Sequence, residues 1–158
     1  MNQQSKFVNL LMIDGKKSRA FKCVCDALFY LKRYTVTNDS TSVASFISER
    51  NKANDGANIL ATAIKNVTPS VEVKKVRRAG NTFLIPAILS QHKAETLAMR
   101  WIIESARKKQ RNSTQSFSEC LADEIYQAFN KQGKARQKRD ELHTIATQNR
   151  ANIRFRWW

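Results

Sequence analysis

Residues 71–88 read VEVKKVRRAGNTFLIPAI, and this stretch decides the fold class because its pattern differs from that of its neighbours. In its first half valine alternates with charged residues, and Thr82–Pro86 makes a second extended run. Residues 79–81, Ala-Gly-Asn, supply turn residues between the two runs. We therefore predict a β-hairpin at 71–88. Pro86 should lie on an edge or beyond the paired part, because proline donates no backbone hydrogen bond.

The residues on both sides of this hairpin have helical spacing, with apolar side chains three and four positions apart. Before the hairpin we expect a short helix through Phe7–Leu11 that Gly15 ends, a helix over residues 18–33, and a helix through Ile59–Val67 that Pro69 stops. After it we expect a helix from Ala94 to the basic run 107–109, one that follows the capping box Ser116–Glu119, and one at about 134–150. The predicted fold is mainly α: a single domain, residues 1–158, forming a bundle of about six helices with a β-hairpin arm that protrudes between helices three and four.

The apolar spacing also predicts which side chains are buried. The inward residues should be Phe21, Val24, Cys25, Leu28 and Leu31 in the second helix, and Leu142, Ile145 and Ala146 in the last. Trp101 lies on the apolar stripe of its helix and is expected in the core. Residues 35–57 are rich in Thr, Ser, Asn and Asp, which predicts a polar connection, with a helical turn at Val43, Phe46 and Ile47.

The charge of the chain indicates an anionic partner. Lys and Arg number 28 against 13 Asp and Glu, which gives a formal charge of +15. Such a surplus opposes the compact state through self-repulsion and is typical of proteins that bind a polyanion. Residues 71–111 and 131–158 are strongly basic, whereas 112–130 hold three acidic residues and no basic one. We expect the basic segments to face nucleic acid, and 112–130 to face solvent or a protein neighbour.

Other classes of protein find little support in the sequence. No run approaches the roughly 18 apolar residues of a membrane-spanning helix, and the N-terminus lacks the marks of a secretory or transit signal. Cys23, Cys25 and Cys120 fit neither a disulfide framework nor zinc-ligand spacing, so we interpret them as structural thiols and predict no metal and no cofactor. Neither histidine has a nucleophilic residue at a spacing typical of a catalytic site. Gly15–Ser18 lacks the first glycine of a phosphate-binding loop. We predict no catalytic site.

Three clusters of basic residues are suited to neutralising phosphates. They are Lys16, Lys17 and Arg19 after the first helix; Lys74, Lys75, Arg77 and Arg78 on the hairpin; and Arg107, Lys108, Lys109 and Arg111 at the end of the fourth helix. Cations at a helix end also balance the helix dipole, so the third cluster alone is weak evidence. Lys138, Arg139, Arg150, Arg154 and Arg156 extend the cationic surface into the C-terminal part.

The basic C-terminal tail, residues 150–158, ends in Phe-Arg-Trp-Trp. Bases or riboses can stack on such rings, and arginine can hold phosphates through two hydrogen bonds. One tryptophan can equally pack back on the bundle. The sequence leaves both interpretations open.

Four segments resemble the family of protein seven of the small ribosomal subunit, the universal S-seven family. They are Lys6–Asn9 with Asp14–Ser18, Asn66–Val73, Leu97–Lys108, and Asn149–Ala151 with Phe155–Trp157. With the helices between them they cover nearly the whole chain in order. The chain departs from the family pattern at the hairpin turn, where Arg77–Asn81 replaces the usual Gly-Gly, and in the longer connection at 35–57.

The resemblance implies a helical bundle with a protruding hairpin that binds small-subunit ribosomal RNA and organises the subunit head. Its implied partners are neighbouring head proteins, with exit-site tRNA and the messenger RNA path close by, and no membrane. The divergence resembles that of a mitochondrial member, with a bacterial cytoplasmic protein as the alternative. The alternative function is a free-standing basic helical protein that binds DNA or RNA as an architectural factor. Basic residues spread over loops, hairpin and tail suit an irregular RNA surface better than a helix-turn-helix does.

Positions matching the family add Lys6 and Arg100 to the site. The predicted ribosomal RNA-binding residues are therefore Lys6, Lys16, Lys17, Arg19, Lys74, Lys75, Arg77, Arg78, Arg100, Arg107, Lys108, Lys109, Arg111, Lys138, Arg139, Arg150, Arg154, Arg156 and Trp157.

Overall fold

The computed structural model describes residues 3–38, 56–78 and 80–157. In chain order the elements are α1 (Gln3–Leu11), α2 (Lys17–Asn38), α4 (Gly56–Val67), β1 (Val71–Arg78), β2 (Asn81–Ile88), α5 (Gln91–Arg111), α6 (Phe117–Phe129), α7 (Lys134–Gln148) and the 3₁₀ helix η2 (Arg150–Phe155). The prediction of a mainly α single domain with one hairpin after the third helix is confirmed over these residues.

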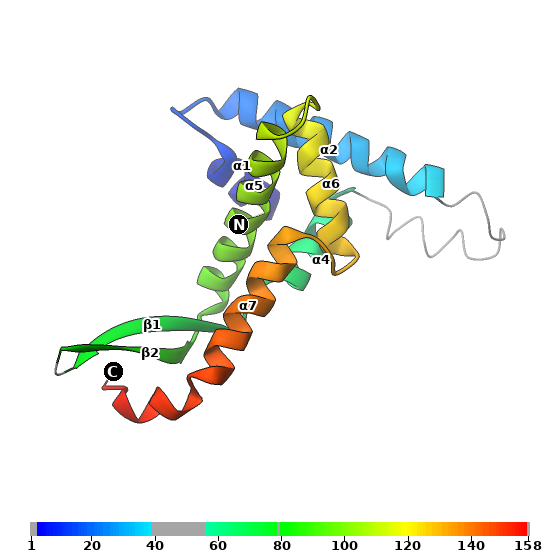
Figure 1. The fold of residues 1–158 in the computed structure, drawn as a ribbon. Coiled ribbons are helices and arrows are strands. Elements are labelled where there is room, and N and C mark those ends of the chain that lie inside the picture. The colour runs from blue at the N-terminus through cyan, green and yellow to red at the C-terminus, as the bar shows by residue number, and fades with distance from the viewer. Residues whose placement is uncertain (1–2, 39–55, 79, 158) are drawn as a thin grey trace.

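Helix α6 lies at the centre of the bundle (Figure 1) and packs against α2, α4, α5 and α7. Its residues Leu121, Ala122, Ile125 and Ala128 are at most 2% exposed and belong to the main core cluster. The helix starts at the predicted capping box. The backbone N–H of Glu119 donates to the Ser116 hydroxyl, and the N–H of Ser116 donates to the Glu119 carboxylate.

The prediction that residues 112–130 face solvent or another protein is wrong for the middle of α6. Glu124 is only 3% exposed, and its Oε2 has no hydrogen-bond partner among the described residues. Burial raises the pKa of this carboxyl, although the charges of Lys109 and Lys134 lower it. The helix is buried because four others surround it, and this arrangement cannot be inferred from its charge.

The hairpin has the predicted bounds and a regular register. Its strands pair antiparallel from Val71 opposite Ile88 to Arg78 opposite Asn81, and Gly80 in the turn has φ +81°. Pro86 lies inside the ladder, opposite Val73. Each strand of this two-stranded sheet is an edge, so a residue without a backbone donor is tolerated there.

Asn66, the next-to-last residue of α4, connects the bundle to the base of this arm. Its side-chain amide donates to the carbonyls of Ala128 (3.2 Å) and Phe129 (2.9 Å), at the end of α6. Its own carbonyl accepts from Arg136 (2.7 Å) and Arg139 (3.1 Å) of α7. One residue thus ties α4, α6 and α7 together directly before the chain enters β1.

Helix α7 also holds the start of the hairpin through His143. The backbone N–H of Ser70 donates to His143 Nε2 at 3.3 Å, which requires an unprotonated ring nitrogen. Burial, and then the charge of Arg139, lower the pKa of this histidine. The ring is therefore neutral at pH 7 and remains an acceptor.

Two predicted inward faces differ from the observed ones. On α2, Val24 and Leu31 are buried and Leu28 is half-buried, but Phe21 is 59% exposed and Cys25 is exposed. Ala20 and Ala27 take their places inside. On α7, Ala146 is buried, Leu142 is half-buried, and Ile145 is 39% exposed. On α2 the two alanines share the inner face with Val24 and Leu31, and on α7 the buried residues are Ala135 and Ala146.

Some of the remaining sequence predictions agree with the structure and others do not. Trp101 packs against the core in a half-buried position, and Cys120 is buried. Gly15 has the left-handed conformation expected, at φ +71°, but it lies in the turn before α2 and not at the end of α1. Residues 35–38 continue α2 and 56–57 begin α4. The rest of the predicted connection, with Val43, Phe46 and Ile47, falls outside the described residues.

Replacing Glu124 with Gln should stabilise the fold at pH 7 by about 1 kcal/mol, because it removes a buried charge whose burial outweighs the attraction of Lys109 and Lys134. The raised folded-state pKa means that the wild type loses stability as pH rises from about 4.5 through that value. The gain should therefore vanish near pH 4. Chemical unfolding at both pH values measures it, with the exposed Glu141→Gln as the matched control. A variant less stable than wild type at pH 7 would contradict this account of α6.

Candidate RNA-binding surface

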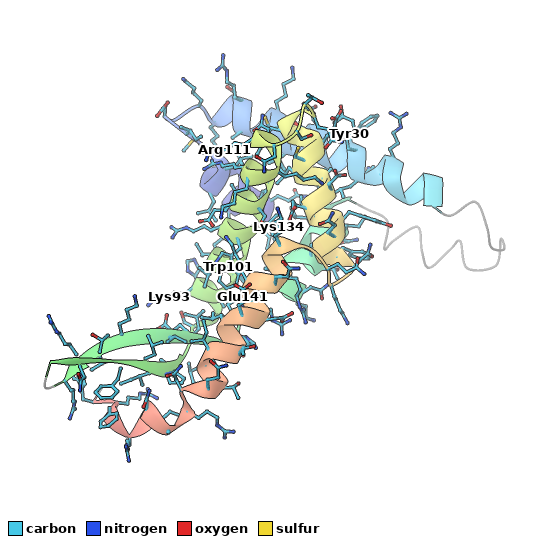
Figure 2. The ribbon with its side chains drawn as sticks, in the orientation of Figure 1. Tyr30, Lys93, Trp101, Arg111, Lys134 and Glu141 are labelled. Atoms are coloured by element: carbon cyan, nitrogen blue, oxygen red, sulfur yellow. The ribbon has the colours of Figure 1, made fainter. Side chains whose placement is uncertain are left out.

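One group of predicted cations meets at the end of the bundle that lies away from the hairpin. Lys16, Lys17 and Arg19 are exposed in the α1–α2 loop and the first turn of α2. Lys108 and Arg111 are exposed at the end of α5, and Arg107 is half-buried beside them. Leu11, Lys16, Arg19 and Arg107 line one shared hollow, so segments far apart in sequence come together here. We name these six cations the loop–α5 cluster; Figure 2 shows Arg111 at its position on α5.

The second group lies on the hairpin and the tail. Lys74, Lys75, Arg77 and Arg78 are exposed on β1, and Arg150, Arg154 and Arg156 are exposed on or after η2. Lys74 also forms an ion pair with Glu72 at 3.4 Å. The hairpin and η2 run side by side at the other end of the molecule (Figure 1), where β2 contacts η2. We name these seven cations the arm cluster.

The two faces of the hairpin have different surroundings. Because side chains alternate along a strand, Val76, Phe83, Ile85 and Ala87 share one face. Ile85 and Ala87 are buried there, although neither belongs to the main core cluster. Lys75 and Arg77 share the opposite face, together with the exposed Ile88. The face that carries Lys75 and Arg77 is therefore the one open to a partner.

The tail packs on the covered face of the arm. The Phe155 and Phe83 rings stack with centroids 4.8 Å apart, and Asn152 donates from its side chain to the Leu84 carbonyl at 3.1 Å. The guanidinium of Arg154 lies 4.9 Å from the centre of the Phe155 ring. The aromatic residue that packs back is thus Phe155, while Trp157 is 73% exposed. The 3₁₀ helix at the C-terminus therefore holds the arm through contacts that the two strands alone would lack.

Five predicted RNA-binding cations are engaged inside the protein. Lys6 lies 3.7 Å from Glu95, Lys109 lies 2.8 Å from Asp123, and Lys138 lies 2.6 Å from Glu104. Arg107 donates to the Leu11 carbonyl at 3.2 Å, and Arg139 donates to Asn66. Burial, followed by the nearby charge of Arg136, lowers the pKa of Arg139. These residues hold the bundle together, and Arg107 alone among them also lines the loop–α5 hollow.

Sequence reasoning missed exposed residues near both clusters. Lys93 is exposed in the first turn of α5, close to the hairpin base (Figure 2), and Lys22 is exposed on α2. Each is a single lysine outside a basic run, so the sequence offers no signal for it. Gln110 and Phe117, which line the hollow with Arg107, were also missed because neither is charged.

The described ranges hold neither a membrane-spanning helix nor a cluster of metal ligands. No helix there is both long and apolar enough to cross a membrane. No three His, Cys, Asp or Glu side chains of those residues gather as metal ligands. All three cysteines are free, with Cys23 half-buried and Cys25 exposed, so the interpretation of Cys25 as a buried structural thiol is wrong.

Comparison with known proteins identifies the family. The profile described as Ribosomal protein S7p/S5e matches residues 2–150. This chain is a member of that family. A relative in Prototheca wickerhamii, small ribosomal subunit protein uS7m, is 51% identical across all of this chain and 90% of its own length. The protein of the same name in Marchantia polymorpha is 39% identical over 97% of this chain, which spans 59% of that relative. Small ribosomal subunit protein uS7 of a Dehalococcoides mccartyi strain is 36% identical over 97% of this chain and 85% of its own length.

Family membership decides several predictions. The resemblance to the S-seven family is confirmed, and the chain is a small-subunit ribosomal protein. The family consists of ribosomal structural proteins, in agreement with the prediction that the chain is not an enzyme. The uS7m relatives are the mitochondrial ones and support a mitochondrial ribosome as its location. Membership of a ribosomal protein family argues against the alternative of a free-standing architectural protein.

Replacing Phe155 with Ala should loosen the tail from the arm by about 1 kcal/mol, the usual value of an aromatic pair beyond its buried area. Amide hydrogen exchange at residues 82–85 should accelerate, while exchange in α6 stays unchanged because Phe155 does not touch the main core. Ile153→Ala is the matched control, since Ile153 lies in the same 3₁₀ helix and is 47% exposed. Equal acceleration in both variants would mean that the Phe83–Phe155 stack does not hold the tail.

Proposed function

We propose that this protein binds small-subunit ribosomal RNA through its two cationic clusters and so organises the subunit head, near exit-site tRNA and the messenger RNA path. The observation that carries the proposal is the placement of the loop–α5 cluster and the arm cluster at opposite ends of α5 (Figure 1). Helix α5 has 21 residues, so it separates them by about 30 Å.

Two separated clusters suit an RNA organiser better than one continuous patch does. Each cluster can neutralise the phosphates of a different RNA segment, and each neutralised phosphate releases condensed counterions. The rigid helix between them then sets the distance between the two segments. Two RNA segments held in this way can no longer move freely relative to each other. This favours the binding of components that join the subunit later.

The arm is the part best suited to reach beyond its own RNA site. Its open face presents Lys75 and Arg77, and its distal end carries Arg78 next to the turn. Because the tail stiffens the arm, it can present these cations to a nearby strand without first becoming ordered. This supports the proposed proximity to messenger RNA and tRNA. Neighbouring head proteins are further proposed partners, and the exposed rings of Phe21 and Phe29 on α2 suit a protein contact.

Affinity for small-subunit ribosomal RNA should fall steeply as salt rises, with a log–log slope of magnitude above about 4. Arg77→Ala with Arg78→Ala should reduce that magnitude by up to about 1.5, and Lys108→Ala with Arg111→Ala should do the same. Both double variants should keep the wild-type melting temperature, because all four side chains are exposed.

Filter binding across a salt series measures the slopes, and circular dichroism reports the fold. Glu141→Gln serves as the control, because it alters one exposed charge on α7, outside both clusters. A flat salt response of the wild type would overturn the proposal. A melting transition lost in the arm variant would mean that the hairpin tip is needed for the bundle to fold.

A further inference from the structure

The hollow beside the loop–α5 cluster has features that phosphate neutralisation does not use. Its volume is about 310 Å³, and it lies where the α1–α2 loop, the start of α2, the end of α5 and the start of α6 meet. Leu11, Ile13 and Phe117 line it with apolar surface. Ile13 is 58% exposed, and Phe117 is only partly buried against the core. An apolar recess this open would be unusual on a surface that bound phosphates alone.

Polar groups stand around this apolar recess. Arg107 is anchored, because its Nη2 donates to the Leu11 carbonyl at 3.2 Å and its side chain is half-buried. Gln110, one helical turn further along α5, lines the hollow with an exposed neutral amide. Lys16 and Arg19 lie on the rim and are exposed. Asp14 is also on the rim, 3.9 Å from the Lys16 ammonium, and its carboxylate is an acceptor.

We propose that this hollow receives one unpaired RNA base, an adenine or a cytosine, turned out of its strand, while Lys16 and Arg19 hold the phosphates next to it. The inference rests on the proposed RNA-binding function and adds the class of nucleotide that the loop–α5 cluster takes.

Stacking is the first reason for a base. Protein sites for single-stranded RNA hold splayed bases against aromatic rings and guanidinium planes. The hollow has one of each, in Phe117 and Arg107. The hydrogen bond from Arg107 to Leu11 restricts that guanidinium before RNA arrives, so less entropy is lost on stacking.

The hydrogen-bonding groups are the second reason. A carboxamide can match the edge of any base, and the added acceptor of Asp14 favours adenine and cytosine, whose amino group lies beside an accepting ring nitrogen. A carboxamide offers one donor and one acceptor side by side. Gln110 can therefore donate to the ring nitrogen and accept from the amino group of adenine or cytosine. Asp14 offers a further acceptor for that amino group and repels phosphate, which leaves the phosphates to Lys16 and Arg19. A base paired in a duplex has no free edge for these groups.

The test is chemical probing of a small-subunit ribosomal RNA fragment bound to the full chain. Dimethyl sulfate modifies the free ring nitrogens of unpaired adenine and cytosine, and hydroxyl radicals report contacts along the sugar–phosphate backbone. In the wild-type complex we expect one unpaired adenine or cytosine to be protected from dimethyl sulfate within the backbone footprint of the loop–α5 cluster. Gln110→Ala and Phe117→Leu should each restore its reactivity, with the backbone footprint unchanged.

Affinity supplies an independent readout. Phe117→Leu should weaken binding by about tenfold, the usual effect of one base–aromatic stack. Gln110→Ala should weaken it by roughly threefold to tenfold. Neither changes a charge, so neither should alter the salt slope. Arg111→Ala is the control: it removes one exposed cation that does not line the hollow, and it should lower the slope without restoring dimethyl sulfate reactivity.

The outcomes separate this inference from the function on which it rests. If RNA binds with its backbone footprint but no base protection depends on Gln110 and Phe117, the hollow holds no base and the inference fails alone. A carbodiimide, which modifies the pairing edges of unpaired guanine and uracil, is used in parallel; if the protection that depends on Phe117 falls on one of those bases, the assigned base class is wrong. If the wild type gives no footprint at any salt concentration, the RNA-binding function itself fails. Leucine keeps the apolar packing of Phe117, and an unchanged melting temperature would exclude unfolding as the cause of any loss.

Discussion

The hydrogen bonds of Asn66 are the constraint on which the position of the arm depends. Its amide donates to the carbonyls of Ala128 and Phe129 at the end of α6, where the last carbonyls of a helix have no partner within the helix. The Ala128 carbonyl also accepts from the backbone N–H of Lys131. The carbonyl of Asn66 in turn receives two arginines of α7. The chain reaches the hairpin a few residues later, so the direction in which β1 leaves the bundle is set by three helices at once. The segment Asn66–Val73 resembles the family pattern at the place where this junction enters the arm.

The second constraint is that some cations are paired within the protein while others are exposed. Arg136 and Arg139 meet at a single carbonyl, and Lys109 and Lys138 are each paired with a carboxylate from another helix. These cations hold neighbouring helices together. The predicted RNA-binding cations that stay exposed lie mostly at the two ends of the molecule, separated by the length of α5, and Arg100 is exposed between them in the middle of α5. The predicted RNA-binding cations are therefore divided between contacts that join helices and an exposed surface concentrated at two ends.

The sequence predicted local features well, because local signals determine them. The hairpin at 71–88, the capping box at Ser116 and the stop at Pro69 depend on residues within a few positions of one another. Periodicity failed where neighbours decide burial: Phe21 is exposed and Ala27 is buried because α2 turns its small residues to the core. Glu124 is inside because α6 is surrounded. The same limit applies to the site, since neither the hollow between Lys16 and Arg107 nor the folding of Phe155 onto Phe83 can be derived from spacing.

The central claim is that the two ends of α5 hold two different RNA segments at the same time. Hydroxyl-radical footprinting of the ribosomal RNA fragment tests it most directly, with the two charge-removing double variants compared at saturating protein. The account predicts two separate protected regions for the wild type. Arg77→Ala with Arg78→Ala should clear only one of them, and Lys108→Ala with Arg111→Ala only the other. A single protected region that both double variants weaken equally would contradict the account.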